Sequence, residues 1–427
     1  MNFDLMHPRD QIVLIMARIY RYGMNTTSGG NLSILDEAGD VWITPAGVDK
    51  GTLGPDDIVC VHKDGTCTGV HKPSSEYPFH LAIYAKRPDV RAVLHAHPTA
   101  LVACSIVHRL PDTRVMPQVE YVCGKVGYAP YALPGSADLG NVIADVFAQG
   151  HQTVLLENHG IVTAGETLFQ AFQRFETLDF CARIELNARR LGDVRPLTDA
   201  QLGLLRTTRH LLPEFTLAMH TAREKELRKI MCTMIHRAYE HELITSTGGT
   251  FSARLGADEF LITPNGLDRK YLDEGDLLVV RHGAREAGKI PSRSVVLHRT
   301  IYQQHADIHA IILAHPSNVM AFGVSGTRLD TRTIPESYYV LREVPSLPNG
   351  MQFMDMDAVA ATLSRSAPAV VIENDCLLVT GATLLQAFDR LEVADFSAHA
   401  IIQSRALGPV QPITDTQVAE LRAAFHF

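Results

Sequence analysis

Three histidines in the first half of the chain have the residue type and spacing of a divalent-metal site. His95 and His97 are separated by one residue at the end of the apolar run RAVL, and His159 follows a second apolar run, TVLLEN. Residues i and i+2 of a strand point to the same face, so the first two imidazoles can hold one cation. Three imidazole ligands that leave one coordination position open are typical of a catalytic zinc ion. The residues alone also allow ordinary loop histidines, since the chain has 20 of them.

A stretch rich in hydroxyl groups adds a carboxylate to this set. Ser74 and Ser75 are suitable N-cap residues for a helix, and Glu76 follows them as a first-turn acid. Hydroxyl and backbone N–H groups at a helix N-terminus also bind anions. Two tight loops of small residues, 29–31 and 44–47, are either simple turns or further walls of the same pocket.

These side chains have to be positioned by strands and helices. The apolar period of Ile12, Ile15, Met16 and Ile19 predicts an opening helix that ends at Gly23. Strands are predicted at residues 31–35, 40–44, 58–61, 92–97 and 153–158, and helices at 75–87, 138–149 and 167–191. This order favours an α/β fold in three layers, with a mostly antiparallel central sheet flanked by helices. A doubly wound parallel sheet is the alternative.

The whole arrangement occurs twice along the chain. The segment from Ile12, IVLIMARIYRYGMNTTSGGNLS, aligns without a gap with MCTMIHRAYEHELITSTGGTFS, which begins at Met231. Further segments align in the same order, beginning at His80 and His298, at Val154 and Val370, and at Pro196 and Pro412. We therefore predict two domains, 1–215 and 216–427. Their junction near residues 207–225 is expected to run through a helix, because it carries helix formers and no Gly/Ser-rich linker.

The second copy has lost most of the candidate metal site. His315 matches His97, but Leu313 stands at the position of His95, and a leucine side chain cannot ligate a cation. Four other positions differ as well, with Asp375 for His159, Ser294 for Glu76, Thr250 for Asn31 and Arg293 for Ser75. Arg293 is either a solvated surface residue or a guanidinium that binds an anion. We expect the chemistry to be confined to the first copy.

The motifs of the first copy resemble those of the class II aldolase/adducin family in type and order. They are Gly30-Asn31-Leu32-Ser33, Thr44-Pro45-Ala46-Gly47, Lys72-Pro73-Ser74-Ser75-Glu76, His95-Ala96-His97 and Asn158-His159-Gly160. The resemblance covers residues 8–210 and recurs in degenerate form over 225–427. This family includes L-fuculose-phosphate aldolase, pentulose-phosphate epimerases, decarboxylases and dehydratases.

The resemblance implies a role for each motif. The three histidines would hold a divalent cation, Zn²⁺ by default, with Mn²⁺ or Co²⁺ as alternatives. Glu76 would be the general acid/base. Tyr121 would protonate the leaving aldehyde in a neighbouring subunit's site, or else be a core or interface aromatic residue. A substrate phosphate would be bound by Asn31, Gly47, Ser74 and Ser75. Ala46 departs from the family, which often has a hydroxyl residue there, and this departure removes one donor to a phosphate.

The reaction implied by the resemblance is that of a metal-dependent lyase. It would cleave a carbon–carbon bond, in an aldol-type reaction, in a small sugar-like hydroxy-carbonyl compound, phosphorylated or not, as part of carbohydrate metabolism. The metal would stabilise the charge of an enediolate. The alternatives are decarboxylation, epimerisation or dehydration at the same site, a small-molecule sensor, or a non-catalytic scaffold like the adducin head domains.

The resemblance also implies an assembly. The single-domain enzymes of this family are four-fold tetramers with active sites at subunit interfaces. Two tandem chains can supply four domains, which predicts a homodimer that forms a pseudo-four-fold ring. Tyr339, the counterpart of Tyr121 in the second copy, would then complete the working site as a catalytic residue.

Composition excludes several other classes of partner. The net charge is −8 and no basic cluster with interleaved aromatics occurs, so neither nucleic acid nor an anionic membrane is expected as a partner. No apolar run approaches the roughly 18 residues of a membrane span, and the N-terminus lacks a signal pattern. The seven cysteines are scattered and form no CxxC. These features predict a cytoplasmic protein that acts on a small molecule.

Overall fold

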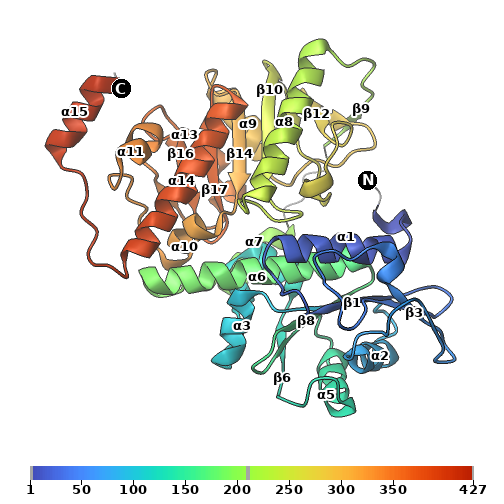
Figure 1. The fold of residues 1–427 in the computed structure, drawn as a ribbon. Helices are drawn as coiled ribbons and strands as arrows, with labels where there is room; N and C mark the ends of the chain where they lie inside the picture. Colours follow the sequence, from blue (N-terminus) through green and yellow to red (C-terminus); the bar gives the residue numbers. More distant parts are fainter. Residues whose placement is uncertain (1–2, 208–211, 426–427) are drawn as a thin grey trace. The chain divides into compact units, whose positions relative to one another are not determined.

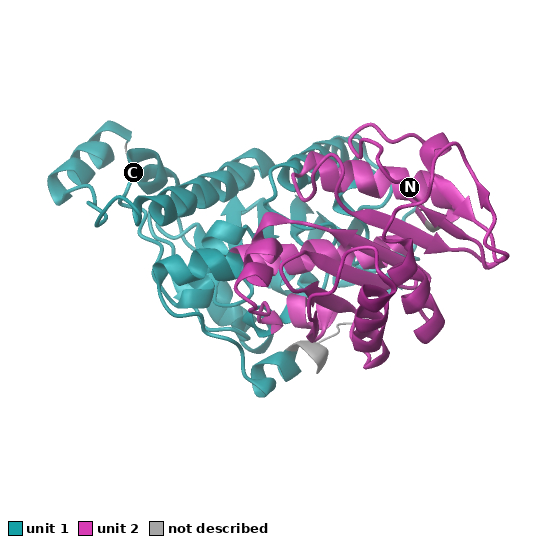
Figure 2. Ribbon diagram, turned by 60° about the horizontal axis from the view of Figure 1, so that its bottom comes forward, with its two compact units in different colours: residues 1, 114–117, 184–427 teal, residues 2–113, 118–183 magenta. Residues whose placement is uncertain are grey.

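The computed structural model describes residues 3–207 and 212–425 (Figure 1). The chain divides into two compact units, each with its own sheet (Figure 2). One unit comprises residues 2–113 and 118–183, and the other comprises residues 1, 114–117 and 184–427.

The first unit is built on a sheet of eight strands. In spatial order these are β4 (Cys67–Thr68), β3 (Val59–Val61), β2 (Val41–Ile43), β1 (Asn31–Leu35), β5 (Ala92–Ala96), β8 (Ile161–Gly165), β7 (Thr153–Leu156) and β6 (Val126–Ala129). Neighbouring strands are antiparallel except β6 and β7, which are parallel. Strands β1 and β5 therefore lie in the middle of the sheet, where the side chains at their ends can be enclosed.

Helices cover both faces of this sheet. Helix α1 (Pro8–Arg21) lies on one face, and α2 (Tyr77–Lys86) and α5 (Ala137–Ala148) lie on the other (Figure 1). α1 buries Ile12, Ile15 and Ile19 at the three- and four-residue spacing of one helix face. Phe79 and Ile143 join side chains of the sheet in an apolar core. The remaining helical segments of this half are η1 (Phe3–Leu5), η2 (Pro55–Asp57), α3 (Thr99–Ile106), η3 (Thr113–Val115), α4 (Pro117–Cys123), α6 (Leu168–Leu191) and α7 (Asp199–Thr207).

The second unit repeats this plan in a sheet of nine strands. In spatial order these are β15 (Ser346–Leu347), β16 (Ala369–Ile372), β17 (Cys376–Gly381), β14 (Ala310–Ala314), β10 (Thr250–Gly256), β11 (Glu259–Ile262), β12 (Leu278–Arg281), β13 (Ala284–Glu286) and β9 (Glu214–Phe215). Its helical segments are α8 (Ala222–Glu240), η4 (Arg269–Tyr271), α9 (Val295–Gln304), α10 (Ser317–Ser325), α11 (Pro335–Leu341), α12 (Met351–Met354), α13 (Met356–Thr362), α14 (Leu384–Ser404) and α15 (Asp415–Phe425). β10 pairs antiparallel with β11 and β14, as β1 does with β2 and β5. The duplication seen in the sequence therefore extends to the strand order.

The predicted three-layer α/β fold with a mostly antiparallel sheet is confirmed, and the doubly wound parallel alternative is wrong. The opening helix ends at Arg21, just before Gly23, which has a φ of +65°. Strands β4, β6 and β8 and helices α3, α4 and α7 were not predicted from the sequence, because segments this short have no clear apolar period.

The junction between the copies differs from the expectation. Residues 208–211 of the predicted helical junction lie outside the described residues. Residues 212–221 are not helical and include β9, so the expectation of a helix is wrong for them. The helix formers of this stretch belong to α8, which begins at Ala222 behind the N-cap Thr221. The boundary between residues 215 and 216 stays a prediction.

Within the two described stretches of chain, no helix combines the length and the apolar character needed to cross a membrane.

Candidate metal centre

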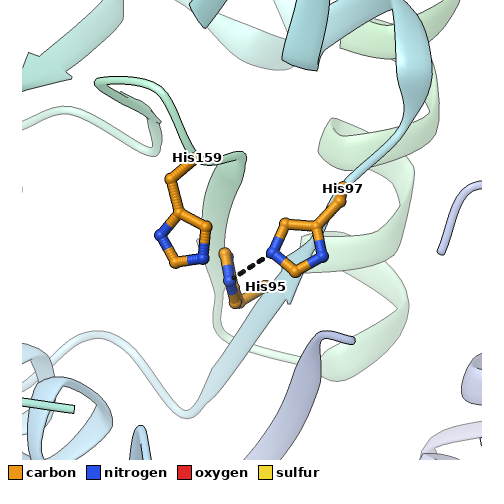
Figure 3. Close-up of side chains that lie close together, drawn as sticks. All are labelled: His95, His97 and His159. Carbon is orange, nitrogen blue, oxygen red and sulfur yellow. Dashed lines mark hydrogen bonds between the residues drawn. The ribbon is translucent and has the colours of Figure 1, made fainter. Parts of the chain in front are cut away.

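Strand pairing brings the three predicted histidine ligands together. His95 lies on β5 and His97 directly follows it, while His159 lies in the turn between β7 and β8. β5 pairs with β8 so that Ala96 faces Ile161, which carries the β7–β8 turn to the end of β5. The candidate ligand atoms of all three lie within 4.8 Å of one another, and the rings face a common centre (Figure 3).

Glycines make room for these imidazoles. A Cβ atom on Gly160 would lie 2.6 Å from Cδ2 of His97, and one on Gly29 would lie 2.9 Å from Nδ1 of the same ring. Both distances are below van der Waals contact, so a larger residue at either position would displace His97. The glycines of the 29–31 loop and the Asn-His-Gly turn thus line the candidate site.

His95 and His97 are held in the neutral form that a metal requires. Nδ1 of His95 lies 2.9 Å from the carbonyl oxygen of Ile161. A carbonyl only accepts, so Nδ1 carries the proton and Nε2 presents its lone pair. Burial, together with His159, lowers the pKa of His95 to about 3. Burial and the neighbouring His95 lower the pKa of His97 to about 3 as well. Neutral imidazoles are the ligating form.

Glu76 completes the cluster. Its Oε2 lies 3.5 Å from Nε2 of His95, and its Oε1 lies 3.8 Å from Nε2 of His159. Oε1 is buried and has no hydrogen-bond partner in the described part of the chain. A buried carboxylate oxygen without a donor is costly, and a divalent cation among the three histidines would supply the missing positive partner. These residues therefore fit a divalent metal ion, although its binding and its identity stay predictions.

A chain of buried hydrogen bonds leads to Glu76. Nδ2 of Asn31 donates to Oε2 of Glu76 over 2.7 Å, and Oδ1 of Asn31 lies 2.5 Å from Nε2 of His80. Burial lowers the pKa of His80 well below its usual value, so the ring has one proton, which Nε2 donates to Asn31. Nδ1 of His80 then accepts from Ser33, and Ser33 accepts from the hydroxyl of Tyr84, each over 2.7 Å. Donation runs in one direction along the chain and fixes the orientation of Asn31.

The loops predicted to bind phosphate lie beside each other. The backbone N–H of Ser74 donates to the carbonyl of Thr44, and that of Ala46 donates to the carbonyl of Lys72. Ser75 and Gly47 are exposed, whereas Ser74 is buried. The helix begins later than predicted. Its N-cap is Glu76, so neither serine is the cap, although Oγ of Ser74 accepts a bond from the backbone of Glu76.

A buried cation that was not predicted from the sequence, Lys50, lies beneath these loops. Nζ of Lys50 donates to the carbonyls of Pro45 and Val48, and burial lowers its pKa. At the same place in the second copy, the buried guanidinium of Arg269 binds the carbonyls of Gly249 and Pro264. The retention of a cation in both copies, Lys50 aligned with Arg269, was the signal in the sequence.

Of the two predicted catalytic tyrosines, Tyr121 lies in the same unit as the histidine cluster and Tyr339 lies in the other unit. Tyr121 lies on α4 with 67% of its surface exposed. Tyr339 lies on α11, where its ring stacks on Phe425 at a centroid distance of 4.8 Å. A role for either residue stays a prediction.

The second copy keeps the scaffold without the cluster. Thr250 on β10 faces Leu313 on β14, as Asn31 faces His95 in the first copy. Thr250 binds the hydroxyl of Ser292. His298 retains its bond to Ser252, but its Nε2 has no partner, because threonine is too short to replace the asparagine.

One other group among the described residues has metal-like spacing, that of Asp40, Cys60 and His62. Nδ1 of His62 binds Asp40 and Nε2 binds Thr68, each over 2.8 Å. Both ring nitrogens are therefore engaged in hydrogen bonds, which explain the grouping without a metal.

Comparison with known proteins assigns the fold to a family. The sequence profile of the class II aldolase and adducin N-terminal domain matches residues 10–186 and again residues 229–402. This chain belongs to the class II aldolase and adducin family. The family and the tandem duplication inferred from the motifs are both confirmed.

Relatives within the class II aldolase family carry out more than one reaction. The 3-oxo-tetronate 4-phosphate decarboxylase of Escherichia coli K12 is 35% identical over 205 residues, which cover 47% of this chain and 95% of that protein. The 5-deoxy-D-ribulose 1-phosphate aldolase of Bacillus thuringiensis serovar kurstaki is 32% identical over 204 residues, covering 46% and 93%. The L-fuculose phosphate aldolase of Methanocaldococcus jannaschii is 31% identical over 178 residues, covering 42% and 95%. Each relative matches nearly full length against less than half of this chain.

Two solved structures are similar to part of this chain. YgbL of Escherichia coli is 34% identical and covers 47% of this chain and 97% of its own, with a TM-score of 0.43. An L-fuculose 1-phosphate aldolase is 31% identical and covers 46% and 93%, also with a TM-score of 0.43.

Proposed function

We propose that the first copy is a metal-dependent lyase that cleaves a carbon–carbon bond next to a carbonyl group in a small sugar phosphate, with aldol cleavage as its principal reaction. The observation that carries this proposal is the convergence of three imidazoles and the unpartnered Oε1 of Glu76 on one centre. Such costly arrangements are concentrated at functional sites, and a non-catalytic scaffold does not require one. The relatives named above, two aldolases and a decarboxylase, support the same class of reaction.

The residues of the site divide the work between charge and proton transfer. A divalent ion held by His95, His97 and His159 would act as a Lewis acid for the negative charge that develops on the substrate oxygen. Glu76 would carry the proton to or from the carbon or oxygen beside the broken bond, as a general acid/base. Asn31 would hold the Glu76 carboxylate in place through the 2.7 Å hydrogen bond.

The neighbouring loops would bind the phosphate of the substrate. Exposed Ser75 and Gly47 offer hydroxyl and backbone donors, and the buried ammonium of Lys50 adds positive charge beneath the 44–47 loop. Ala46 contributes no hydroxyl. All three relatives described above act on phosphorylated compounds, which supports this choice of substrate class.

Decarboxylation of a β-keto acid is the second candidate. It requires the same stabilisation of charge next to a carbonyl, followed by protonation of the carbon. The specific observation in its favour is the 35% identity to 3-oxo-tetronate 4-phosphate decarboxylase over 95% of that enzyme.

The proposal is tested with a panel of phosphorylated substrates on the full chain loaded with Zn²⁺, Mn²⁺ or Co²⁺. L-Fuculose 1-phosphate and 5-deoxy-D-ribulose 1-phosphate report aldol cleavage through the released aldehyde, and 3-oxo-tetronate 4-phosphate reports decarboxylation through CO₂. We expect turnover that requires metal and that is lost in His97→Ala but kept in His315→Ala. Absence of turnover on the whole panel by the fully metal-loaded protein would contradict the proposal.

A further inference from the structure

A separate cavity of about 330 Å³ lies in the second unit. It is lined by Gly381 at the end of β17, where this strand pairs with Ala310 at the start of β14. The degenerate metal position is at the other end of these strands, where Ala314 pairs with Leu377 and His315 follows. The cavity is therefore distinct from the position that corresponds to the metal centre.

Three guanidinium groups line this space, which we call the arginine cavity after Arg342, Arg365 and Arg390. Arg342 follows α11, Arg365 follows α13, and Arg390 lies on α14. Arg342 donates to the carbonyl of Arg365, and Arg390 donates to that of Thr380. Burial, and then the charge of Arg342, lower the pKa of Arg390.

Carboxylates contribute little to the lining of this cavity. Asp307 is the single carboxylate residue that lines the cavity, and its oxygen lies 3.8 Å from Nε of Arg365. Asp389, next to Arg390 in sequence, opposes the effect of Arg342 on the Arg390 pKa but has the smaller influence. With His305 neutral, the lining carries two net positive charges in a chain of net charge −8.

The same place in the first copy is electrically balanced. The positions of the first copy that align with the cavity lining include two arginines, Arg87 and Arg174. They also include two carboxylates, Asp89 and Glu166. Arg87 is bound by Asp89 and by two backbone carbonyls. The second copy has replaced Glu166 by Ala382, Gly124 by Arg342 and Gln149 by Arg365. It has also replaced Arg87 by His305. The positive charge is therefore a feature of the second copy and is absent at the aligned positions of the first.

One of these replacements carries a backbone cost. Gly124 has a φ of +61°, which glycine adopts freely, whereas Arg342 keeps a φ of +55°. A residue with a side chain is strained in this region of backbone conformation. Such residues persist where their position is useful, and here the arginine extends into the cavity lining.

We propose that the arginine cavity binds a small ligand with at least two anionic oxygens, either a phosphate group or a dicarboxylate. Guanidinium groups bind such oxygens in pairs, with parallel N–H donors. Hydroxyl and amide groups of Ser364 and Gln386 line the same space and add neutral donors. A volume of about 330 Å³ is at the lower end of ligand pockets, which restricts the ligand to a small metabolite.

The test is hydrogen–deuterium exchange of the full chain with and without inorganic phosphate or malonate, at constant ionic strength. This measurement locates binding along the chain, so it separates the arginine cavity from the loops of the first copy. The variants are Arg342→Gly and Arg365→Gln, which restore the residues of the first copy. The matched control is Arg328→Gln, an exposed arginine of the same unit that does not line the cavity.

In the wild-type chain, we expect the anion to protect the backbone around Arg342 and Arg365 from exchange. In either variant, the same protection should require an anion concentration at least tenfold higher than in wild type. Arg328→Gln should require the same concentration as wild type. Protection by phosphate identifies a phosphate site, and protection by malonate alone identifies a dicarboxylate site. The proposal is overturned if neither anion protects these segments, or if protection survives in both variants. It is also overturned if Arg328→Gln reduces protection equally. Because Arg365 is exposed, Arg365→Gln leaves the fold intact and keeps the test valid if Arg342→Gly misfolds.

Discussion

Asn31 donates a hydrogen bond of 2.7 Å to Oε2 of Glu76, and this bond leaves Oε1 as the oxygen without a partner. The amide is itself fixed from behind by His80, which is fixed by Ser33. The orientation of Glu76, the proposed acid/base, is thus set by a series of buried hydrogen bonds that begins at residues of the sheet and of α2. In the second copy this series stops at His298, because Thr250 takes the place of the asparagine.

Asn31→Thr tests the importance of this bond by introducing the residue of the second copy. We expect kcat to fall roughly 10- to 100-fold with little change in bound metal, because Glu76 loses the donor that orients it. The reverse exchange in the second copy, Thr250→Asn, is the control and should leave kcat unchanged. A kcat within twofold of wild type in Asn31→Thr would rule out this positioning role.

Metal content distinguishes the two copies directly. We expect close to one divalent ion per chain by elemental analysis, because only the first copy has the histidine cluster among the described residues. His97→Ala should lose this ion, since it removes one of three ligands, whereas His315→Ala should retain it. Retention of the ion in His97→Ala, or its loss in His315→Ala, would contradict the assignment of the site to the first copy.

The predicted interleaved homodimer is tested through its tyrosines. If Tyr339 of one chain completes the site of another, Tyr339→Phe should lower kcat about 100-fold or more, as expected for loss of a general acid. Tyr121→Phe should then have little effect, because Tyr121 would face a degenerate copy. Steady-state turnover measures the effect of each substitution, and light scattering gives the mass of the assembly. Unchanged turnover in Tyr339→Phe, or an active monomer, would dismiss this arrangement.

We expect the stability of the second copy to depend on pH through Asp375, which stands at the position of His159. Burial raises the pKa of Asp375 from its usual value to about 6. Between about pH 4 and 6 the folded state therefore holds a proton that the unfolded state has released, so stability falls as pH rises through this window. Asp375→Asn should remove this penalty and raise the free energy of unfolding by up to about 3 kcal/mol at pH 7, with a smaller gain near pH 4.

Urea unfolding at several pH values measures this effect. Asp389→Asn, at an exposed aspartate of the same unit, is the control and should show no gain. An Asp375→Asn variant that is less stable than wild type at pH 7 would mean that the carboxylate has a structural partner that outweighs its burial.

The sequence alone determined the duplication, the layered α/β fold and the histidine cluster. These features can be predicted because they depend on local patterns in the sequence. The HxH pair at the end of RAVL needs only the two-residue period of a strand to place both rings on one face. The apolar period from Ile12 to Ile19 likewise specifies the buried face of α1 without reference to the rest of the chain.

Only the tertiary structure decided how these parts act on one another. Asn31 and His95 are far apart in sequence, and the register of β1 against β5 sets them opposite each other. The unpartnered Oε1 of Glu76 and the presence of Arg342 and Arg390 in the lining of one cavity depend on which residues distant in sequence become neighbours. Sheet register and burial are cooperative outcomes of the whole fold. No local pattern specifies them. For this reason the buried hydrogen bonds that lead to Glu76 and the arginine cavity could not be predicted from the sequence.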